Sequence, residues 1–202
     1  MELTDKENIR PTEAEIQFLT LAFNKFYDSF EKIMQDDFWT LDATIRYSTL
    51  KDGFAIYAEL LNYEPIKFVI QAMKTARPPM EAEIGGELFK FFRNVISHFP
   101  LFDKWDDIYV TKSLVNWDKH GQTIDKFLEK YKGKPSVKYR FWEADKKLMT
   151  YLEINFPTEY NNTFKIYLKD ILKEKEGIKF SFILMRKIID TQVLKENEPN
   201  NS

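Results

Sequence analysis

One apolar stretch of the sequence contains an arginine, an asparagine and a histidine: Phe91-Phe92-Arg93-Asn94-Val95-Ile96-Ser97-His98-Phe99-Pro100. Histidine titrates near neutral pH, so it can take a proton from a hydroxyl group or give one to a leaving oxygen. A planar guanidinium can stabilise negative charge that develops on a phosphate. Arg93 and His98 therefore suit metal-independent cleavage of RNA by its own 2′-hydroxyl, with Asn94, and less strongly Ser97, in support.

The spacing of these residues indicates one amphipathic helix. On a wheel of about 100° per residue the apolar side chains share one face, and Lys90, Arg93, Asn94, Ser97 and His98 share the other. Arg93 and His98 would flank this polar face, so that a group bound between them could contact both. The alternative is an ordinary solvent face, on which Arg93 pairs with a carboxylate and His98 favours the helix dipole.

The segment Arg93-Asn94-Val95-Ile96-Ser97-His98 resembles the Arg-x4–6-His motif of the HEPN superfamily, in which a polar residue follows the arginine. The resemblance covers these six residues and the helical character of the chain. It implies a helical bundle, a metal-independent endoribonuclease without a cofactor, and a homodimer whose two motifs meet at the interface. It also implies that Arg93 stabilises the transition state, that His98 is the acid or base, and that Asn94 supports them. The implied setting is a toxin–antitoxin or phage-defence system, in which a protein antitoxin or regulator can be a further partner.

A basic stretch at residues 130–147 is the second candidate for RNA contact. It holds seven basic and two acidic residues, and aromatic rings lie between them. Cations for phosphates and rings for stacking are what single-stranded RNA requires. The candidate RNA-binding residues are Lys130, Lys132, Lys134, Lys138 and Arg140, and the rings are Tyr131, Tyr139, Phe141 and Trp142. The alternative is a solvated charged face whose rings belong to the core.

Other polar residues give weaker patterns. His120 is expected at the surface, and Asp36-Asp37 and Asp106-Asp107 are expected in loop or capping roles. The chain has no cysteine, which excludes disulfides, thiol catalysis and zinc sites built on thiolates. No phosphate-binding or dinucleotide-binding glycine motif and no nucleophile elbow is present. Two histidines, His98 and His120, cannot form a conventional zinc site, so no metal or cofactor is expected.

The apolar spacing predicts helices through most of the chain. Thr12 and Glu15 form the capping-box pattern at the start of a first helix that ends near Gln35. Further helices are expected at about 41–63, from Pro65 to before Pro78, and at 81–98, where Pro100 stops the helix. Lys51-Asp52-Gly53 favours a turn that would divide the helix at 41–63 in two. Gly85-Gly86 permits close helix approach or marks a helix start.

The second half of the chain is expected to continue the bundle. Residues 100–122 are predicted as an ordered loop, and helices are predicted around 124–131, 141–152 and 164–172, the last closed near Gly177. Residues 178–193 indicate a last helix, although Ile178 to Phe182 also alternates like a strand. The predicted class is all-α, a HEPN-like bundle of six to eight helices.

Length and composition indicate one soluble domain. The 202 residues include 18 Phe, 10 Tyr and 4 Trp, enough to fill a large core. The expected division is an N-terminal tail at 1–10, a helical domain at 11–195 with a HEPN-like core at about 11–118, and a disordered tail at 196–202. The sequence shows no signal peptide or membrane span, which favours a cytoplasmic protein without a membrane partner. A net charge of −2 argues against wrapping of duplex DNA.

The function expected from these residues is a metal-independent endoribonuclease that binds RNA and works as a homodimer. Two alternatives remain open. The chain could be an inactive helical module that binds RNA or a nucleotide through the same face, or a protein-interaction domain in which the Arg–His spacing is a coincidence.

Overall fold

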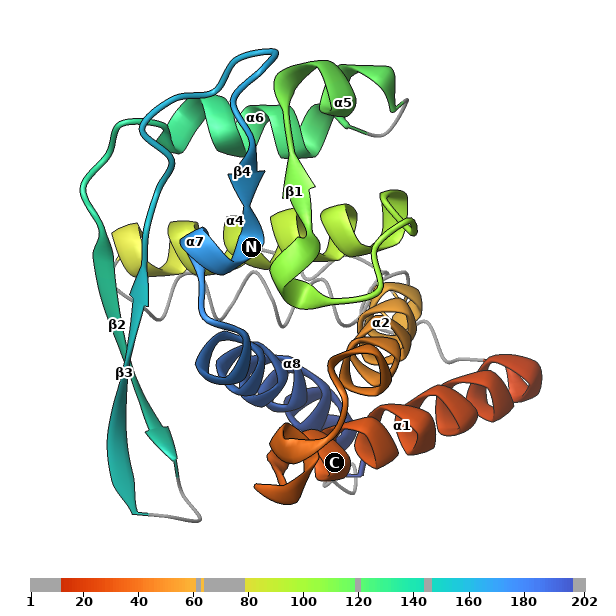
Figure 1. Cartoon of the computed structure of the whole chain (residues 1–202). Helices are drawn as coiled ribbons and strands as arrows, with labels where there is room; N and C mark the ends of the chain where they lie inside the picture. Colours follow the sequence, from red (N-terminus) through yellow and green to blue (C-terminus); the bar gives the residue numbers. More distant parts are fainter. Residues whose placement is uncertain (1–11, 61–62, 64–78, 119–120, 144–146, 198–202) are drawn as a thin grey trace, which may run out of the picture.

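The computed structural model describes residues 12–60, 63, 79–118, 121–143 and 147–197. This part of the chain is mostly helical (Figure 1). Its helices are α1 (Glu13–Met34), η2 (Asp37–Thr40), α2 (Ala43–Leu60), α4 (Pro79–His98), η3 (Trp105–Asp107), α5 (Lys112–Trp117), α6 (Gln122–Tyr131), α7 (Leu168–Ile171) and α8 (Glu174–Asn197). Its strands are β1 (Tyr109–Val110), β2 (Val137–Glu143), β3 (Leu148–Ile154) and β4 (Ile166–Tyr167). The helix predicted after Pro65 and the N-terminal tail lie outside the described residues.

The first helix begins where the sequence predicts. Thr12 accepts a hydrogen bond on its hydroxyl from the Glu15 backbone N–H at 3.3 Å, and its own N–H donates to the Glu15 carboxylate at 2.6 Å. This reciprocal pair satisfies two backbone donors that a helix start would leave without partners. At the other end, the buried Lys179 of α8 donates to the Met34 carbonyl and to Asp36. The ends of α1 are therefore set by local and by tertiary contacts.

The second helix is continuous through the Lys51-Asp52-Gly53 sequence, so the division predicted there is wrong. Gly53 has a packing role instead. A Cβ atom at this position would lie 2.5 Å from Cζ of Phe182, because α8 passes directly against α2. Only glycine permits this approach, and the loss of helix propensity is the cost of close packing.

Aromatic rings from distant segments fill the core, as the composition predicts. Phe182 stacks on Phe26 at 5.9 Å and meets Phe54 edge-on at 5.5 Å, which joins α8 to α1 and α2. Phe91 of α4 stacks on Phe127 of α6 at 4.5 Å. Each ring pair contributes stabilisation beyond that of the area it buries, and its preferred geometry fixes how the helices cross.

Two small antiparallel sheets correct the all-α prediction. β1 pairs with β4, and β2 pairs with β3 in a hairpin at the left edge of the molecule (Figure 1). The helix predicted at 141–152 is wrong, because the buried positions of this segment alternate as in a strand. Tyr139, Leu152 and Ile154 are buried while their neighbours are exposed. The fold is a mostly helical arrangement with a projecting hairpin.

The segments on either side of the hairpin also differ in part from the prediction. Residues 100–122 contain η3, β1 and α5 as well as loop. The helix predicted at 164–172 is only the short α7, preceded by β4. Gly177 does not close a helix but lies inside α8, where a Cβ atom would come within 2.2 Å of the Leu172 side chain. For Ile178 to Phe182 the helical alternative is confirmed.

No helix among the described residues is long and apolar enough to cross a membrane.

Candidate functional site

The candidate catalytic residues lie at the C-terminal end of α4. Phe91, Phe92, Val95 and Ile96 bury one side of this helix, and the Phe99 N–H bonds to the Val95 carbonyl at 3.0 Å, just before Pro100. The helix therefore stops where the proline predicts. His98 is its last residue.

The polar side of α4 is less open than the helical wheel predicts. Arg93 and His98 are half-buried, Ser97 is exposed, and Asn94 is only 6% exposed. Asn94 therefore does not lie on an ordinary solvent face, which is the alternative interpretation of this polar side. A wheel for one helix does not include its neighbours, and both α2 and α6 pack against α4. The site is thus a partly enclosed polar strip beside the core.

The Arg93 guanidinium is held by neutral groups. Its Nε donates to Oδ1 of Asn94 at 3.1 Å, and Tyr57 of α2 lies close enough to interact with its charge. Burial lowers the pKa of Arg93 from its ordinary value, although an arginine stays protonated at neutral pH. No carboxylate among the described residues forms an ion pair with Arg93. Its terminal nitrogens are therefore suited to bind an anion from outside.

His98 lies about 140° from Arg93 around the helix axis, since it is five positions further along the helix and each position turns by about 100°. The two side chains thus leave α4 in different directions. His98 lies in the last turn of α4, at the negative end of the helix dipole. A ligand that contacts both Arg93 and His98 must extend around the end of α4. Otherwise, groups from another molecule must complete the binding site.

The five candidate RNA-binding residues divide into two sets. Lys130 bonds to Glu87 at 2.9 Å and Lys132 to Glu129 at 2.5 Å, so both charges are partly neutralised. Lys134 lies over the Tyr131 ring at 4.9 Å. Lys138 and Arg140 are exposed on β2 and form no ion pair with a described residue. The structure therefore separates a structural basic set near α6 from a solvent-facing set on the hairpin.

The described rings of the basic stretch divide in the same way, while the Phe141 side chain lies outside what the structure describes. Tyr131 and Tyr139 are buried, with exposed fractions of 2% and 1%, so they belong to the core as the alternative interpretation holds. Trp142 is exposed, and so is Tyr151, which the sequence reasoning missed. Tyr151 lies directly opposite Arg140 in the hairpin. Its only signal in the sequence is the two-residue alternation of β3, whereas the apolar spacing of this segment predicts a helix.

The weaker candidates do not form a further site in the described part of the chain. Asp36 lies 3.5 Å from Lys175 and 3.3 Å from Lys179, and Asp106 and Asp107 lie in η3. His120 is outside the described residues. Among the residues that the structure describes, no three potential metal ligands come together.

Comparison of the chain with protein-family models, with curated proteins and with solved structures gives no match.

Proposed function

We propose that the chain is a metal-independent endoribonuclease whose active groups are Arg93 and His98. The observation that carries this proposal is the state of Arg93. It is a half-buried guanidinium without a carboxylate partner among the described residues, bonded to Asn94 on the same helix end as His98. A cation kept partly out of water costs free energy unless an anion compensates it. A phosphate of the substrate is the compensating group that we propose.

The proposed reaction follows from these groups. The 2′-oxygen of a ribose attacks the adjacent phosphorus and its proton goes to a base, while the bond from phosphorus to the 5′-oxygen breaks. An acid gives that oxygen a proton, which leaves a 2′,3′-cyclic phosphate and a 5′-hydroxyl. His98 serves as the base or the acid. Arg93 binds the phosphate oxygens that gain charge, and Asn94 orients Arg93.

A homodimer would complete such a site. One His98 serves one proton transfer, and a second copy related by a two-fold axis brings a second histidine to the other transfer. The angular separation of Arg93 and His98 around α4 supports this arrangement, because a neighbouring protomer could supply the group that a single chain holds on the far side. A toxin or phage-defence role, in which an antitoxin or regulator restrains the activity, is part of the same proposal.

The second candidate function is an RNA- or nucleotide-binding module that does not cleave. The exposed Lys138 and Arg140 beside Trp142 favour it, since they supply cations and a ring without any acid or base. The two candidate functions differ in one measurable property. The binding module would bind RNA, but no cleaved RNA would form.

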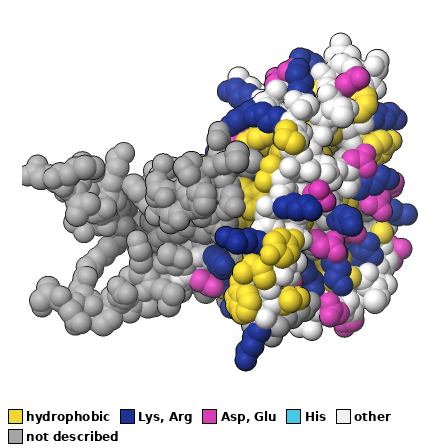
Figure 2. All heavy atoms as spheres, turned by 90° about the vertical axis from the view of Figure 1, so that its left-hand side faces the viewer, with side chains coloured by type: hydrophobic (Ala, Val, Ile, Leu, Met, Phe, Trp, Pro, Cys, Tyr) yellow, Lys and Arg dark blue, Asp and Glu magenta, His cyan; other side chains and the backbone are white. Residues whose placement is uncertain are grey.

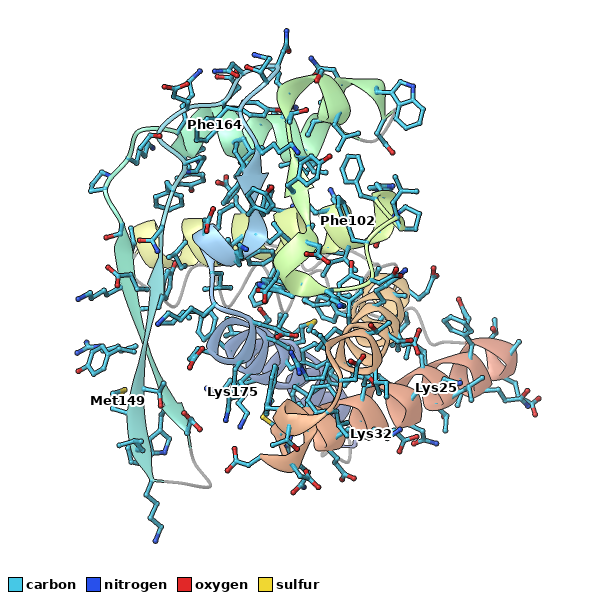
Figure 3. All side chains as sticks on the ribbon, viewed as in Figure 1. Lys25, Lys32, Phe102, Met149, Phe164 and Lys175 are labelled. Carbon is cyan, nitrogen blue, oxygen red and sulfur yellow. The ribbon has the colours of Figure 1, made fainter. Side chains whose placement is uncertain are left out.

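The test is incubation of the purified protein with mixed RNA in EDTA. Arg93→Ala and His98→Ala are compared with Lys25→Ala, which removes an exposed charge from α1 (Figure 3). We expect cleavage by the wild type and by Lys25→Ala, and a loss of about 100-fold or more in the two site variants. Binding without cleavage by the wild type would replace the nuclease proposal with the binding module. Arg93→Lys is a further test, because it keeps the charge and loses the planar fork.

A further inference from the structure

The outer face of the β2–β3 hairpin is a small surface of rings and cations. In an antiparallel pair, residues directly opposite each other point to the same side of the sheet. Tyr139 and Leu152 are opposite each other and buried, which defines the inner face. The outer face therefore carries the alternate residues, with the opposite pairs Lys138 and Glu153, Arg140 and Tyr151, and Trp142 and Met149.

Large side chains on this outer face are open to solvent. The exposed fractions are 48% for Trp142, 42% for Met149 and 65% for Tyr151. Figure 3 shows Met149 on the side of the hairpin that points away from the helices. Figure 2 faces this side of the molecule and shows hydrophobic side chains gathered low on it, with Lys and Arg side chains beside them. Exposed apolar side chains that lie together on one face, rather than singly, are typical of interaction surfaces.

The charges beside these rings favour an anionic ligand. Arg140 and Lys138 form no ion pair with a described residue, and Lys147 is exposed at the turn of the hairpin. Glu153, opposite Lys138, is the acidic residue of the outer face, and Ser136 donates to it at 3.2 Å. The part of the face that holds Trp142, Tyr151 and Arg140 is thus positively charged as well as aromatic.

We propose that this outer face, from Lys138 to Trp142 and from Met149 to Tyr151, binds single-stranded nucleic acid. Trp142 and Tyr151 occupy diagonal positions, about 7–8 Å apart in a sheet, where successive unpaired bases can stack on them. Arg140 and Lys138 contact the phosphates between those bases. A duplex hides its base faces, so it cannot use the rings. That the strand is RNA rests on the proposed function.

The hairpin is anchored so that it can present this face. The buried ring of Tyr139 packs against Phe180 of α8 at 5.7 Å, and Phe180 in turn stacks on Phe89 of α4 at 6.3 Å. The inner half of the hairpin is thereby fixed to the helix that carries Arg93 and His98. One nucleic-acid strand could therefore be bound at two places, with its bases on the hairpin and one of its phosphates at α4.

The experiment measures binding of a fluorescent single-stranded oligonucleotide to the full chain in EDTA, in a His98→Ala background that prevents cleavage. Trp142→Ala and Tyr151→Ala are each expected to weaken binding by about 5- to 150-fold, which corresponds to ~1–3 kcal/mol per stacked base. The matched control is Trp117→Ala, since Trp117 is 81% exposed on α5, away from the hairpin. It should leave affinity unchanged.

Salt dependence separates the two kinds of contact. Arg140→Ala should lower the slope of log K against log salt by about 0.7, the value for one phosphate on a single strand. Trp142→Ala and Tyr151→Ala should lower affinity without changing this slope. Circular dichroism checks that each variant remains folded.

Several results would overturn the inference: binding that is unchanged in the ring variants, equal binding of duplex, or ring variants that alter only self-association. Its failure and that of the nuclease proposal can be told apart. If binding depends on the hairpin and the wild type does not cleave RNA, the binding surface is supported and the nuclease proposal is contradicted. If the wild type cleaves RNA and the hairpin variants change neither cleavage nor binding, the nuclease proposal is supported and the binding surface is contradicted.

Discussion

Replacing Gly53 by alanine is expected to destabilise the protein, although alanine is the better helix former by about 1 kcal/mol. The new Cβ atom would lie 2.5 Å from Cζ and 2.7 Å from Cε1 of Phe182. Ordinary carbon contacts are about 3.5–4.0 Å, so the ring would have to move by about 1 Å. Phe182 is fully buried between Phe26 and Phe54, which leaves it little room.

Overpacking of this kind costs about 1–3 kcal/mol. Subtracting the gain in helix propensity leaves a net loss of up to about 2 kcal/mol. For a chain of this size that is a fall in Tm of about 4–8 °C. The measurement is urea unfolding followed by circular dichroism, with Phe182→Leu and the double variant completing a cycle. The smaller leucine should remove most of the penalty.

The result that would refute this reasoning is a more stable Gly53→Ala variant. A gain of about 1 kcal/mol would mean that helix propensity alone decides the outcome. The side chain of Phe182 would then not lie against Gly53, and α8 would not pack on α2 at this position.

Three further predictions concern ion pairs, the site and alkaline pH. Glu174→Gln should lower the unfolding free energy by about 1–2 kcal/mol, because its half-buried carboxylate bonds to Arg46 at 2.9 Å and links α8 to α2; urea unfolding of Glu174→Gln beside Glu176→Gln checks this. Asn94→Asp should reduce RNA cleavage by about tenfold or more without loss of folding, because a carboxylate beside Arg93 competes with the phosphate; unchanged kcat/KM would contradict it. Burial raises the pKa of several tyrosines, that of Tyr47 to about 12, and Asp190 and Asp125 add to the effect at Tyr27 and Tyr160. Since these folded pKa values exceed the unfolded value of about 10, their stabilisation is complete below pH ~10 and is lost as the pH rises above it; tyrosinate absorbance that titrates fully near pH 10 in the folded protein would refute this.

Local patterns predicted several features of the fold. The capping box at Thr12 and Glu15 starts α1, and Pro100 ends the helix that carries the candidate site. Both are effects of neighbouring residues on the backbone, so they can be read without tertiary structure. The long amphipathic helices follow for the same reason.

The errors arise where tertiary contacts decide the structure. The spacing of Phe141, Ala144, Leu148 and Leu152, at steps of three and four, imitates a helix. The strands on either side instead pair as a hairpin, whose inner residue Tyr139 packs on Phe180 of α8. A short apolar pattern fits either period, and long-range packing selects one.

The candidate site was predictable in the identity of its residues but not in their environment. Nothing in the sequence indicates that Asn94 is buried and accepts a hydrogen bond from Arg93. Nor does it indicate that Glu87 engages Lys130, because these residues lie far apart in the chain and only the fold brings them together. The ion pair of Glu129 with Lys132 is local, three residues along the same stretch.

The most direct test of the proposed function is the chemistry of the cleaved ends. A single-stranded RNA oligonucleotide is incubated in EDTA with wild type, Arg93→Ala and His98→Ala, and the products are identified by mass spectrometry. The proposal predicts 2′,3′-cyclic phosphate and 5′-hydroxyl ends from the wild type and none from either variant. Intact RNA with the folded wild-type protein, or the same ends at the same rate from both variants, would contradict it.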